Sequence, residues 1–223
     1  MILSSTLLVA LAAAGTTPAS AVPVEYEPMH HPVYANQLLR VLDVVIPAHA
    51  RTLYHTHTHD IAGVTISPGP FRSEEAGIPA VDEPPDEPGN VWFEAHQTPY
   101  THRGTNLGER PIHLVAVELL GRQDQVGRPV SGDDGGEAVQ LENARIRVVR
   151  FSLEQGESAP AHSHHGTYAL VALNTGRLSD ACGQPGPRAI ADAGFICVGD
   201  DAPHQISNAG DSLITVLEFE VMQ

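Results

Sequence analysis

The chain of 223 residues contains 13 histidines, and several of them have the spacing of metal ligands. Alternate residues of a β-strand point to the same face, so a His-x-His pair presents two imidazoles together. A third histidine from a distant strand would complete a facial set of three nitrogens, which suits Fe, Mn, Ni, Cu or Zn. Two sets fit this pattern: His55, His57 and His102 in the first half, and His162, His164 and His204 in the second. The sequence therefore predicts a divalent transition metal as cofactor.

These histidines lie at matching places in an internal repeat. His162 follows His55 by 162 − 55 = 107 residues. Further along, His204 follows His102 by 204 − 102 = 102 residues, so one connecting loop is shorter in the second copy. Packing alone gives no reason for all these histidines to fall in register. The repeat therefore favours metal binding in at least one copy.

Short runs rich in Val, Ile and Leu recur in both copies and are bounded by Gly, Pro and Asn, which is typical of β-strands and turns. Beyond the leader, no stretch shows the apolar period of a helix. We expect an all-β fold of sandwiches or barrels. The expected segments are a signal peptide (1–21), module one (22–120), a linker (121–139) and module two (140–223). The Pro-rich, acidic residues 67–90 should form a surface loop or a flap over the first site.

The histidines also belong to a known motif, G-x5-H-x-H-x3,4-E-x6-G. Module two has Gly156, His162, His164, Ala169 and Gly176 at this spacing, and module one has His49, His55, His57, Ala62 and Gly69. A second motif, G-x5-P-x-G-x2-H-x3-N, corresponds with altered internal spacing to Gly194, Gly199, Pro203, His204 and Asn208 in module two, and module one keeps only His102 and Asn106 of it. The chain thus resembles the cupin superfamily, as a bicupin, and more narrowly the small exported bacterial cupins of undefined activity. The resemblance implies two tandem jelly-roll barrels.

The departure from this motif bears on the chemistry. Alanine, at Ala62 and Ala169, stands where the family has its glutamate ligand, which argues against manganese sites of the oxalate decarboxylase or germin type. Cupins related to cysteine dioxygenase and the diketone-cleaving enzymes hold Fe(II) with three histidines, so Fe(II) is the favoured metal. Three neutral ligands leave room for an anionic substrate and O2. Three roles are open for Glu118 and Glu220, which lie on the last strand of each copy. They replace the lost ligand, they hydrogen-bond an imidazole, or they face solvent.

Several other polar residues have two readings. Tyr168, on the ligand face of module two, is the candidate catalytic residue, as a weak acid or an orienting group; alternatively it fills the barrel. His59 is an extra ligand or a rim residue. The remaining histidines lack convincing partners and are expected at the surface: His30, His31, His49, His96, His113 and His165. Structural roles are expected for four more residues, with turns at Asn106 and Asn208 and ion pairs at Arg40 and Arg147.

Charge excludes several classes of function. All 12 basic residues are arginine and 27 are acidic, giving a net charge of −15. Without lysine there is neither Schiff-base chemistry nor a P-loop. The negative charge disfavours nucleic acid and anionic membranes as partners. We expect a small-molecule substrate or ligand, bound by a monomer or homodimer.

The first residues read as a secretion signal. An apolar run precedes Ala19-Ser20-Ala21, which matches an A-x-A cleavage site, although no Lys or Arg precedes Arg40. The alternative is a buried N-terminal helix. We expect a periplasmic or secreted protein, in which Cys182 and Cys197 either pair or remain two small thiols.

Two functions follow from these observations. The first is an exported metal-dependent oxidoreductase of the dioxygenase type, acting on a small organic acid or enolisable molecule. If one site alone is catalytic, module two is favoured, because it matches the motifs better. The second is a non-catalytic metal or small-ligand binding protein, which the missing glutamate favours. A sugar isomerase or epimerase using a histidine base would leave the paired histidine sets unexplained.

Overall fold

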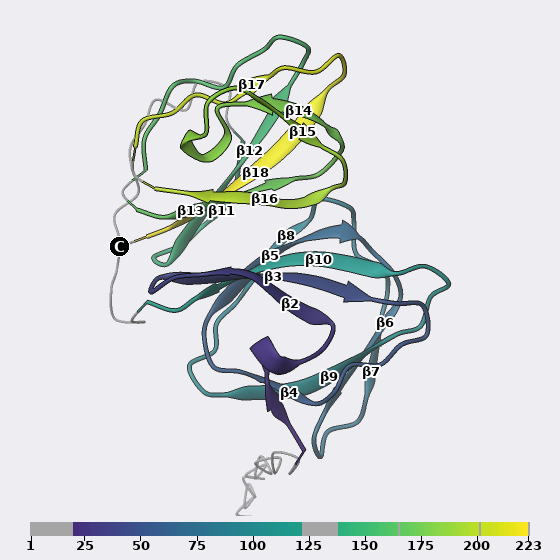
Figure 1. Ribbon diagram of the computed structural model, residues 1–223. Coiled ribbons are helices and arrows are strands. Elements are labelled where there is room, and N and C mark those ends of the chain that lie inside the picture. The colour runs from purple at the N-terminus through teal and green to yellow at the C-terminus, as the bar shows by residue number, and fades with distance from the viewer. Residues whose placement is uncertain (1–19, 122–137, 165, 201, 223) are drawn as a thin grey trace, which may run out of the picture.

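The computed structural model describes residues 20–121, 138–164, 166–200 and 202–222. The predicted signal peptide lies almost wholly outside these residues, as do most of the linker and His165. Within them the chain is all β, apart from the short 3-10 turns η1 (Val24–Tyr26) and η2 (Ala181–Gly183), and two modules lie one above the other (Figure 1). The described part of the chain has no helix of the length and apolarity that crossing a membrane requires.

Module one is a barrel of two five-stranded sheets. The first sheet contains, in spatial order, β1 (Val22–Pro23), β4 (His55–His57), β9 (Tyr100–Asn106), β6 (Phe71–Glu75) and β7 (Val81–Glu83). The second contains β2 (His30–Ala35), β3 (Leu39–Ile46), β10 (Ile112–Leu119), β5 (Ile61–Ser67) and β8 (Val91–Glu94). The antiparallel pairing of β4 with β9 places His55 opposite His102.

Module two repeats this plan with a smaller first sheet. Its large sheet contains β11 (Ala138–Glu142), β12 (Ile146–Leu153), β18 (Ile214–Val221), β13 (Tyr168–Ala172) and β16 (Gly194–Gly199). The small sheet contains β15 (Pro187–Ile190), β14 (Gly176–Ser179) and β17 (Ser207–Asn208). An isolated bridge joins His162 to His204, which matches the pairing of His55 with His102 in module one. The repeat inferred from the sequence is therefore a structural repeat.

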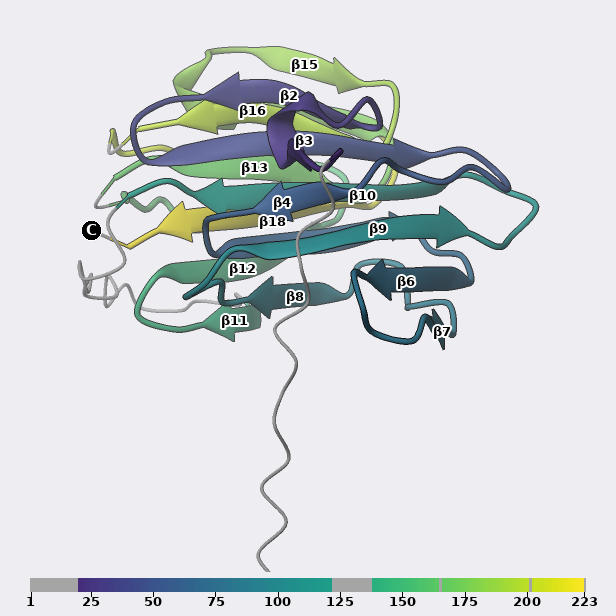
Figure 2. The ribbon, with the colours of Figure 1, turned by 90° about the horizontal axis from the view of Figure 1, so that it is seen from below.

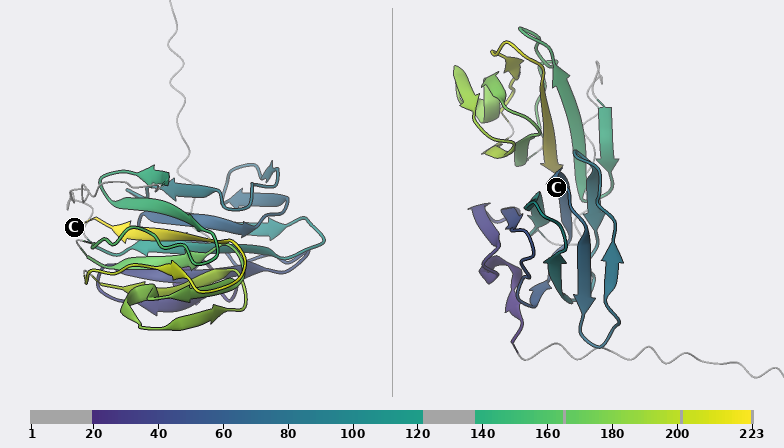
Figure 3. Two further views of the ribbon diagram at one scale, coloured as in Figure 1. Left: turned by 90° about the horizontal axis from the view of Figure 1, so that it is seen from above. Right: turned by 90° about the vertical axis from the view of Figure 1, so that its right-hand side faces the viewer.

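The large sheets of the two modules pack face to face and form a shared core (Figure 1 and Figure 3). Seen from below, the long strands of both modules lie along roughly the same axis (Figure 2). Alternate residues of β18 supply Leu217 and Phe219 to this core, both fully buried. Ala62 and Ala169 lie in it as well. A glutamate at either position would place a carboxylate in an apolar layer between the sheets, which is unfavourable without a partner.

The orientation of these alanines corrects the interpretation of the motif. Ala62 and Ala169 face the other module, whereas the preceding residues, Ile61 and Tyr168, face the interior of their own barrels. The absent family glutamate thus leaves no gap among the histidines at the alanine positions. Any carboxylate ligand has to come from a different strand.

Several structural expectations are confirmed. The amide group of Asn106 donates to the carbonyls of Ile46 and Arg110, and its oxygen accepts from the backbone of Gly108. Asn208 makes the equivalent bonds to Leu153, Ser212 and Gly210 in module two. Arg40 pairs with Glu118 and Glu25, and Arg147 pairs with Glu142. Of the two alternatives left open for Cys182 and Cys197, the structure has the disulfide.

Candidate metal centres

In module one, strands β4 and β9 bring the three predicted histidines together. His55 and His57 point to the same side of β4, and the Nε2 atoms of His57 and His102 are 3.3 Å apart. One nitrogen from each of the three lies within 4.8 Å of the others. His55 is 1 % exposed and His57 7 %, so the cluster is largely withdrawn from water. This set could hold a metal ion.

The tautomer of His55 fits a metal ligand. Its Nδ1 lies 3.0 Å from the carbonyl oxygen of Leu53, so Nδ1 carries the proton and donates it. Nε2 is then left with a lone pair. That atom is buried, and among the described residues it has no hydrogen-bond partner. A bound cation would satisfy this lone pair, and a backbone carbonyl at Nδ1 is the usual support of a metal-bound imidazole.

Module two brings its three predicted histidines together with a fourth residue, Glu218. The Nε2 of His204 is 3.0 Å from the Nε2 of both His162 and His164. Two ligands about 2.1 Å from one metal ion and at right angles to each other lie about 3.0 Å apart, so this spacing suits a shared ion. The carboxylate of Glu218 is 2.9 Å from His162 Nε2. The four residues form the second cluster that could hold a metal ion.

The contact between His162 and Glu218 also favours a bound cation. The Nδ1 of His162 donates to the carbonyl of Pro160 at 2.8 Å, as His55 does to Leu53. In the neutral ring, Nε2 therefore presents a lone pair to a carboxylate that can only accept. Two acceptors 2.9 Å apart repel each other unless a proton or a metal ion lies between them. The donor set fits a transition metal.

The sequence did not single out Glu218 as a candidate ligand; its candidates were Glu118 and Glu220. Glu118 is buried beside Arg40, away from the histidine cluster of module one. Glu220 lies 3.6 Å from His164 Nδ1, on the outer side of that ring, so it contacts an imidazole as one reading expected. The alternation along β18 could have identified Glu218, because it shares a face with Glu220. Its counterpart in module one, at 218 − 102 = 116, is Ala116.

Burial keeps the clustered imidazoles in the neutral, ligating form. Desolvation and then the nearby His30 lower the pKa of His55 to about 4. Desolvation and His55 lower the pKa of His102 to about 3, and burial lowers the pKa of His57 further still. In module two, burial lowers the pKa of His204 to about 4, although the negative charge of Glu218 opposes this shift.

Tyr168 contacts the back of a ligand in module two. Its hydroxyl is 3.0 Å from Nδ1 of His204, whose Nε2 faces the cluster. The ring is 1 % exposed, and burial followed by the charge of Glu218 raises the pKa of its hydroxyl. The structure therefore places Tyr168 where it orients an imidazole, and its catalytic role stays a prediction. The corresponding residue in module one is Ile61, which makes no such bond.

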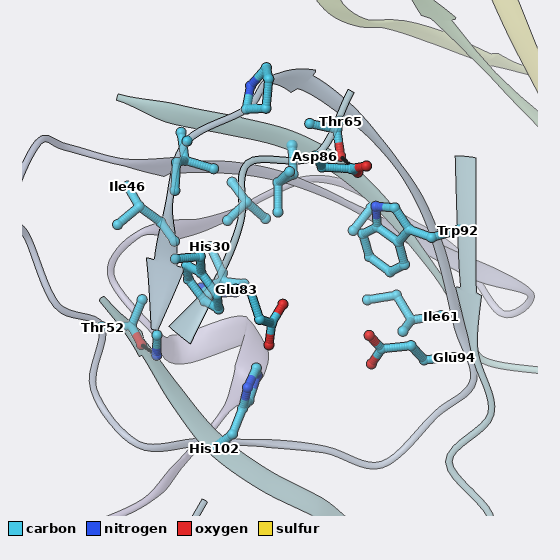
Figure 4. Close-up of a pocket in the computed structure, with 18 of the residues that line it drawn as sticks. His30, Ile46, Thr52, Ile61, Thr65, Glu83, Asp86, Trp92, Glu94 and His102 are labelled. Carbon is cyan, nitrogen blue, oxygen red and sulfur yellow. Dashed lines mark hydrogen bonds between the residues drawn. The ribbon is translucent and has the colours of Figure 1, made fainter. Parts of the chain in front are cut away.

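A cavity of about 530 Å³ opens onto the cluster of module one (Figure 4). His55, His57 and His102 line one part of it, and Ile61 and Trp92 belong to an apolar wall. Residues 83–86 form another part of the lining; they belong to the segment 67–90, which was expected as a loop but contains strands β6 and β7 of the first sheet. The cavity gives the module-one cluster access to an organic molecule.

Two histidines expected at the surface lie beside this cluster instead. His30 is 9 % exposed, its Nδ1 donates to the buried carboxylate of Glu27 at 2.6 Å, and its ring packs 4.4 Å from that of His55. His96 is also 9 % exposed and stacks between the rings of His57 and Tyr100. The N-terminal segment, paired through β1 to β4, carries His30 into the site, a long-range contact that no local pattern encodes.

The remaining histidines lie outside both clusters. His31 and His49 are exposed, as expected, and His49 contacts Glu109. His113 is half-buried and pairs with Asp43 at 2.7 Å, so it is not a free surface residue. His59 bonds to Thr58 and is not among the residues that could share a metal ion, which favours its reading as a rim residue.

Comparison with known proteins places the fold. No family model matches the chain, and no curated protein matches its sequence. AerE from Microcystis aeruginosa is structurally similar at 13 % identity and a TM-score of 0.59, over 89 % of this chain and 100 % of that one. The nickel(II) complex of the pirin YhhW from Escherichia coli is similar at 17 % identity and a TM-score of 0.55, over 86 % and 90 %. A salicylate 1,2-dioxygenase from Pseudaminobacter salicylatoxidans is similar at 11 % identity and a TM-score of 0.54, over 84 % and 72 %.

These similarities confirm the resemblance stated from the motifs at the level of the fold. The chain has the cupin fold, with two jelly-roll barrels in tandem.

Proposed function

We propose that the protein is a metal-dependent oxidoreductase of the dioxygenase type and that its reaction takes place in the cavity of module one. The observation that carries the proposal is the three-histidine cluster at a cavity of about 530 Å³. The similarity to a dioxygenase and to a nickel-bound pirin supports it. A divalent metal, with Fe(II) favoured, would supply a Lewis acid with open positions for substrate and O2.

The protein groups around this cluster have separable roles. His55, His57 and His102 would hold the ion, with His55 fixed by the Leu53 carbonyl. His30, held by Glu27, is positioned to contact a molecule in the cavity. The apolar wall that includes Trp92 excludes water from the bound molecule, which strengthens polar contacts at the histidines.

Module two has the more complete ligand set but a more filled interior. Phe151, Leu170 and Ile206 belong to one continuous buried cluster, and Phe151 stacks on the ring of His162. Their counterparts in module one are Val44, Gly63 and Gly104, which leave room for Trp92 and Phe71 as cavity walls. We therefore assign the metal of module two a structural role. This is the reverse of the preference drawn from the motifs, and it follows from the distribution of space.

The experiment measures metal content and O2 consumption in matched variants. The wild-type protein should bind close to two equivalents of metal by mass spectrometry, and each of His55→Ala/His57→Ala and His162→Ala/His164→Ala should lose about one. O2 uptake with a panel of small organic molecules should disappear with the module-one pair and persist with the module-two pair.

A second function, binding without turnover, is favoured by the buried four-residue cluster of module two. Metal loading in both modules without O2 uptake on any panel member would support this alternative. If module one binds none of Fe, Mn, Ni, Cu and Zn, the oxidoreductase proposal is refuted.

Export of the protein is part of the proposal. The disulfide between Cys182 and Cys197 supports an oxidising compartment. Expression with the native leader, followed by sequencing of the mature N-terminus, should give a chain that begins at Val22. An intact leader on soluble protein inside the cell would contradict export.

A further inference from the structure

Three carboxylates line the cavity of module one: Asp86, which accepts hydrogen bonds from Thr65 and Asn90, and Glu83 and Glu94. Glu83 is the last residue of β7 and Glu94 the last residue of β8. Figure 4 shows both side chains directed into the space that the rings of His30 and His102 also face. Among the described residues that line the cavity, none is arginine, and the chain contains no lysine. A negative wall without a matching positive group is unusual for a site that binds an acid.

The negative charges of Glu83 and Glu94 repel each other. Desolvation and then the charge of Glu94 raise the pKa of Glu83. Glu94 has a side chain that is 58 % exposed and lies 3.6 Å from Nε2 of His96. A cation held between them would relieve their repulsion. Because Glu94 is exposed, its part of the cavity lies on the solvent side.

The histidine cluster that lines the same cavity supplies a second sign of a ligand. His55 is 1 % exposed, and its Nε2 has no hydrogen-bond partner among the described residues. Its Nδ1 is engaged by Leu53, so Nε2 is the atom that faces His57 and His102. The lining of the cavity therefore combines imidazole nitrogens, apolar side chains and the exposed carboxylates Glu83 and Glu94.

Glu94 has no carboxylate counterpart in module two. In module one, Glu94 pairs across the sheet with Ile61. In module two the corresponding pair is Gly199 with Tyr168, so no carboxylate occupies the equivalent place. A difference confined to the module with the cavity points to the ligand of that cavity rather than to the fold.

The geometry points to an organic cation as the ligand of the module-one cavity. We propose a small molecule with an apolar body, an ammonium group between Glu83 and Glu94, and an oxygen function directed at the histidine cluster. Trp92, in the wall, offers an aromatic face to such a cation. The net charge of −15 attracts cations and repels anions during approach. The oxygen end rests on the proposed function, whereas the ammonium end rests on the carboxylates alone. The inference narrows the substrate class away from the small organic acids expected from the sequence.

The test compares three probes of nearly the same shape on zinc-loaded protein, because zinc avoids oxidation of the probes. Dopamine carries a positive charge, 4-ethylcatechol none, and 3-(3,4-dihydroxyphenyl)propanoate a negative charge. Calorimetry at pH 7 should rank them in that order, with dopamine at least tenfold tighter than 4-ethylcatechol. Glu83→Gln/Glu94→Gln should bring the three dissociation constants to within about threefold. Equal affinities in the wild type, or the reverse order, would overturn the proposal.

A matched control separates local charge from overall charge. Glu109→Gln/Glu154→Gln removes two charges at exposed positions outside the cavity lining and should leave the tenfold preference intact. If this control abolishes the preference as fully as the cavity variant does, the net charge alone sets it and the site is refuted.

A second pair of probes distinguishes failure of this inference from failure of the proposed function. 2-Phenylethylammonium and 3-phenylpropanoate lack the catechol oxygens, so they can be compared on metal-free protein. Preference for the ammonium, together with failure to load zinc, would keep the cation site and sink the metal-dependent function. Normal zinc loading without any preference for 2-phenylethylammonium would refute the cation site and leave the metal-dependent function intact.

Discussion

The two modules share one fold and one histidine pattern, but they differ in what surrounds the histidines. Module two adds Glu218 to the three imidazoles and supports His204 with Tyr168. Module one has Ala116 and Ile61 at these places, and both line its cavity. The side chains that complete the cluster of module two therefore occupy the space that module one keeps open. A few inward-facing substitutions in a duplicated barrel can thus give one copy a four-residue cluster and the other copy an open cavity beside its histidines.

We expect the shared core to join the two modules into one folding unit. Phe219 of module two and its counterpart Val117 of module one, at 219 − 102 = 117, both lie fully buried between the large sheets. We expect Phe219→Ala to lower the free energy of unfolding by about 3–5 kcal/mol, and Val117→Ala by less, because the smaller side chain leaves a smaller cavity. Denaturant unfolding followed by fluorescence and circular dichroism measures both.

This prediction also tests how independent the modules are. If they form one cooperative unit, either substitution shifts a single transition detected by both probes. Two separate transitions, with only one displaced by Phe219→Ala, would show that the modules unfold independently in spite of the common core.

Exchanging residues 116 and 218 should exchange the properties of the modules. Glu218→Ala should weaken metal binding in module two by at least about a hundredfold, since loss of supporting groups beyond the ligands alone reduces metal affinity 10–100-fold. Ala116→Glu should add a carboxylate to module one, strengthen its metal binding and reduce the binding of organic probes in the cavity. Metal titration in the His162→Ala/His164→Ala and His55→Ala/His57→Ala backgrounds isolates each site.

A matched control for the exchange is Glu218→Gln, which keeps the volume but removes the charge. Metal affinity similar to that of Glu218→Ala would assign the effect to the charge, whereas wild-type affinity would remove Glu218 from the ligand set. Unchanged probe binding in Ala116→Glu would show that Ala116 does not limit the cavity.

Glu118 and Glu220 occupy equivalent positions but have different surroundings, which predicts a difference in pH dependence. Desolvation raises the pKa of Glu118 to about 7, and Arg40 only partly offsets it. The folded state therefore binds more protons than the unfolded state between about pH 4.5 and 7, so this group stabilises the fold less as the pH rises. Glu118→Gln should flatten the dependence over this window by about 1–3 kcal/mol.

The measurement is the free energy of unfolding of wild type and Glu118→Gln at several pH values from 4.5 to 8. The two curves should diverge as the pH rises, with the variant relatively more stable at pH 8. Parallel curves would mean that Arg40 keeps Glu118 ionised in the fold throughout. Glu220→Gln provides the comparison in module two.

Much of the fold could be predicted because the repeat makes the signal redundant. The strand pattern, the two barrels and both three-histidine clusters all depend on local alternation and on matching positions in the two copies. The repeat could not reveal features present in one module only. Glu27 and His30 enter module one through an N-terminal segment whose counterpart in the repeat would fall within the linker. The position that corresponds to Glu218 in module one is occupied by Ala116.

The orientation of Ala62 and Ala169 shows a second limit of the sequence. A shift of one residue along a strand reverses the face to which a side chain points. The motif allows either three or four residues between the second histidine and the glutamate, so both faces were compatible with it. The packing of one large sheet on the other determines which face the two alanines occupy. That contact joins segments more than 100 residues apart, such as those of Ala62 and Ala169. The cavity depends in the same way on the combined volumes of many distant side chains.

The smallest expected effect concerns the bond between Tyr168 and His204, which module one lacks. Tyr168→Phe removes the hydroxyl 3.0 Å from Nδ1 of His204 but keeps the buried ring. We expect metal affinity in module two to fall about tenfold, the lower end of the range for supporting groups, with module one unchanged. The converse substitution, Ile61→Tyr, places a hydroxyl at the matching position near His102. Metal titration and O2 uptake on both variants distinguish the roles: weaker metal binding with unchanged turnover makes Tyr168 a positioning residue, whereas loss of turnover at full metal loading would restore its catalytic role and move the reaction to module two.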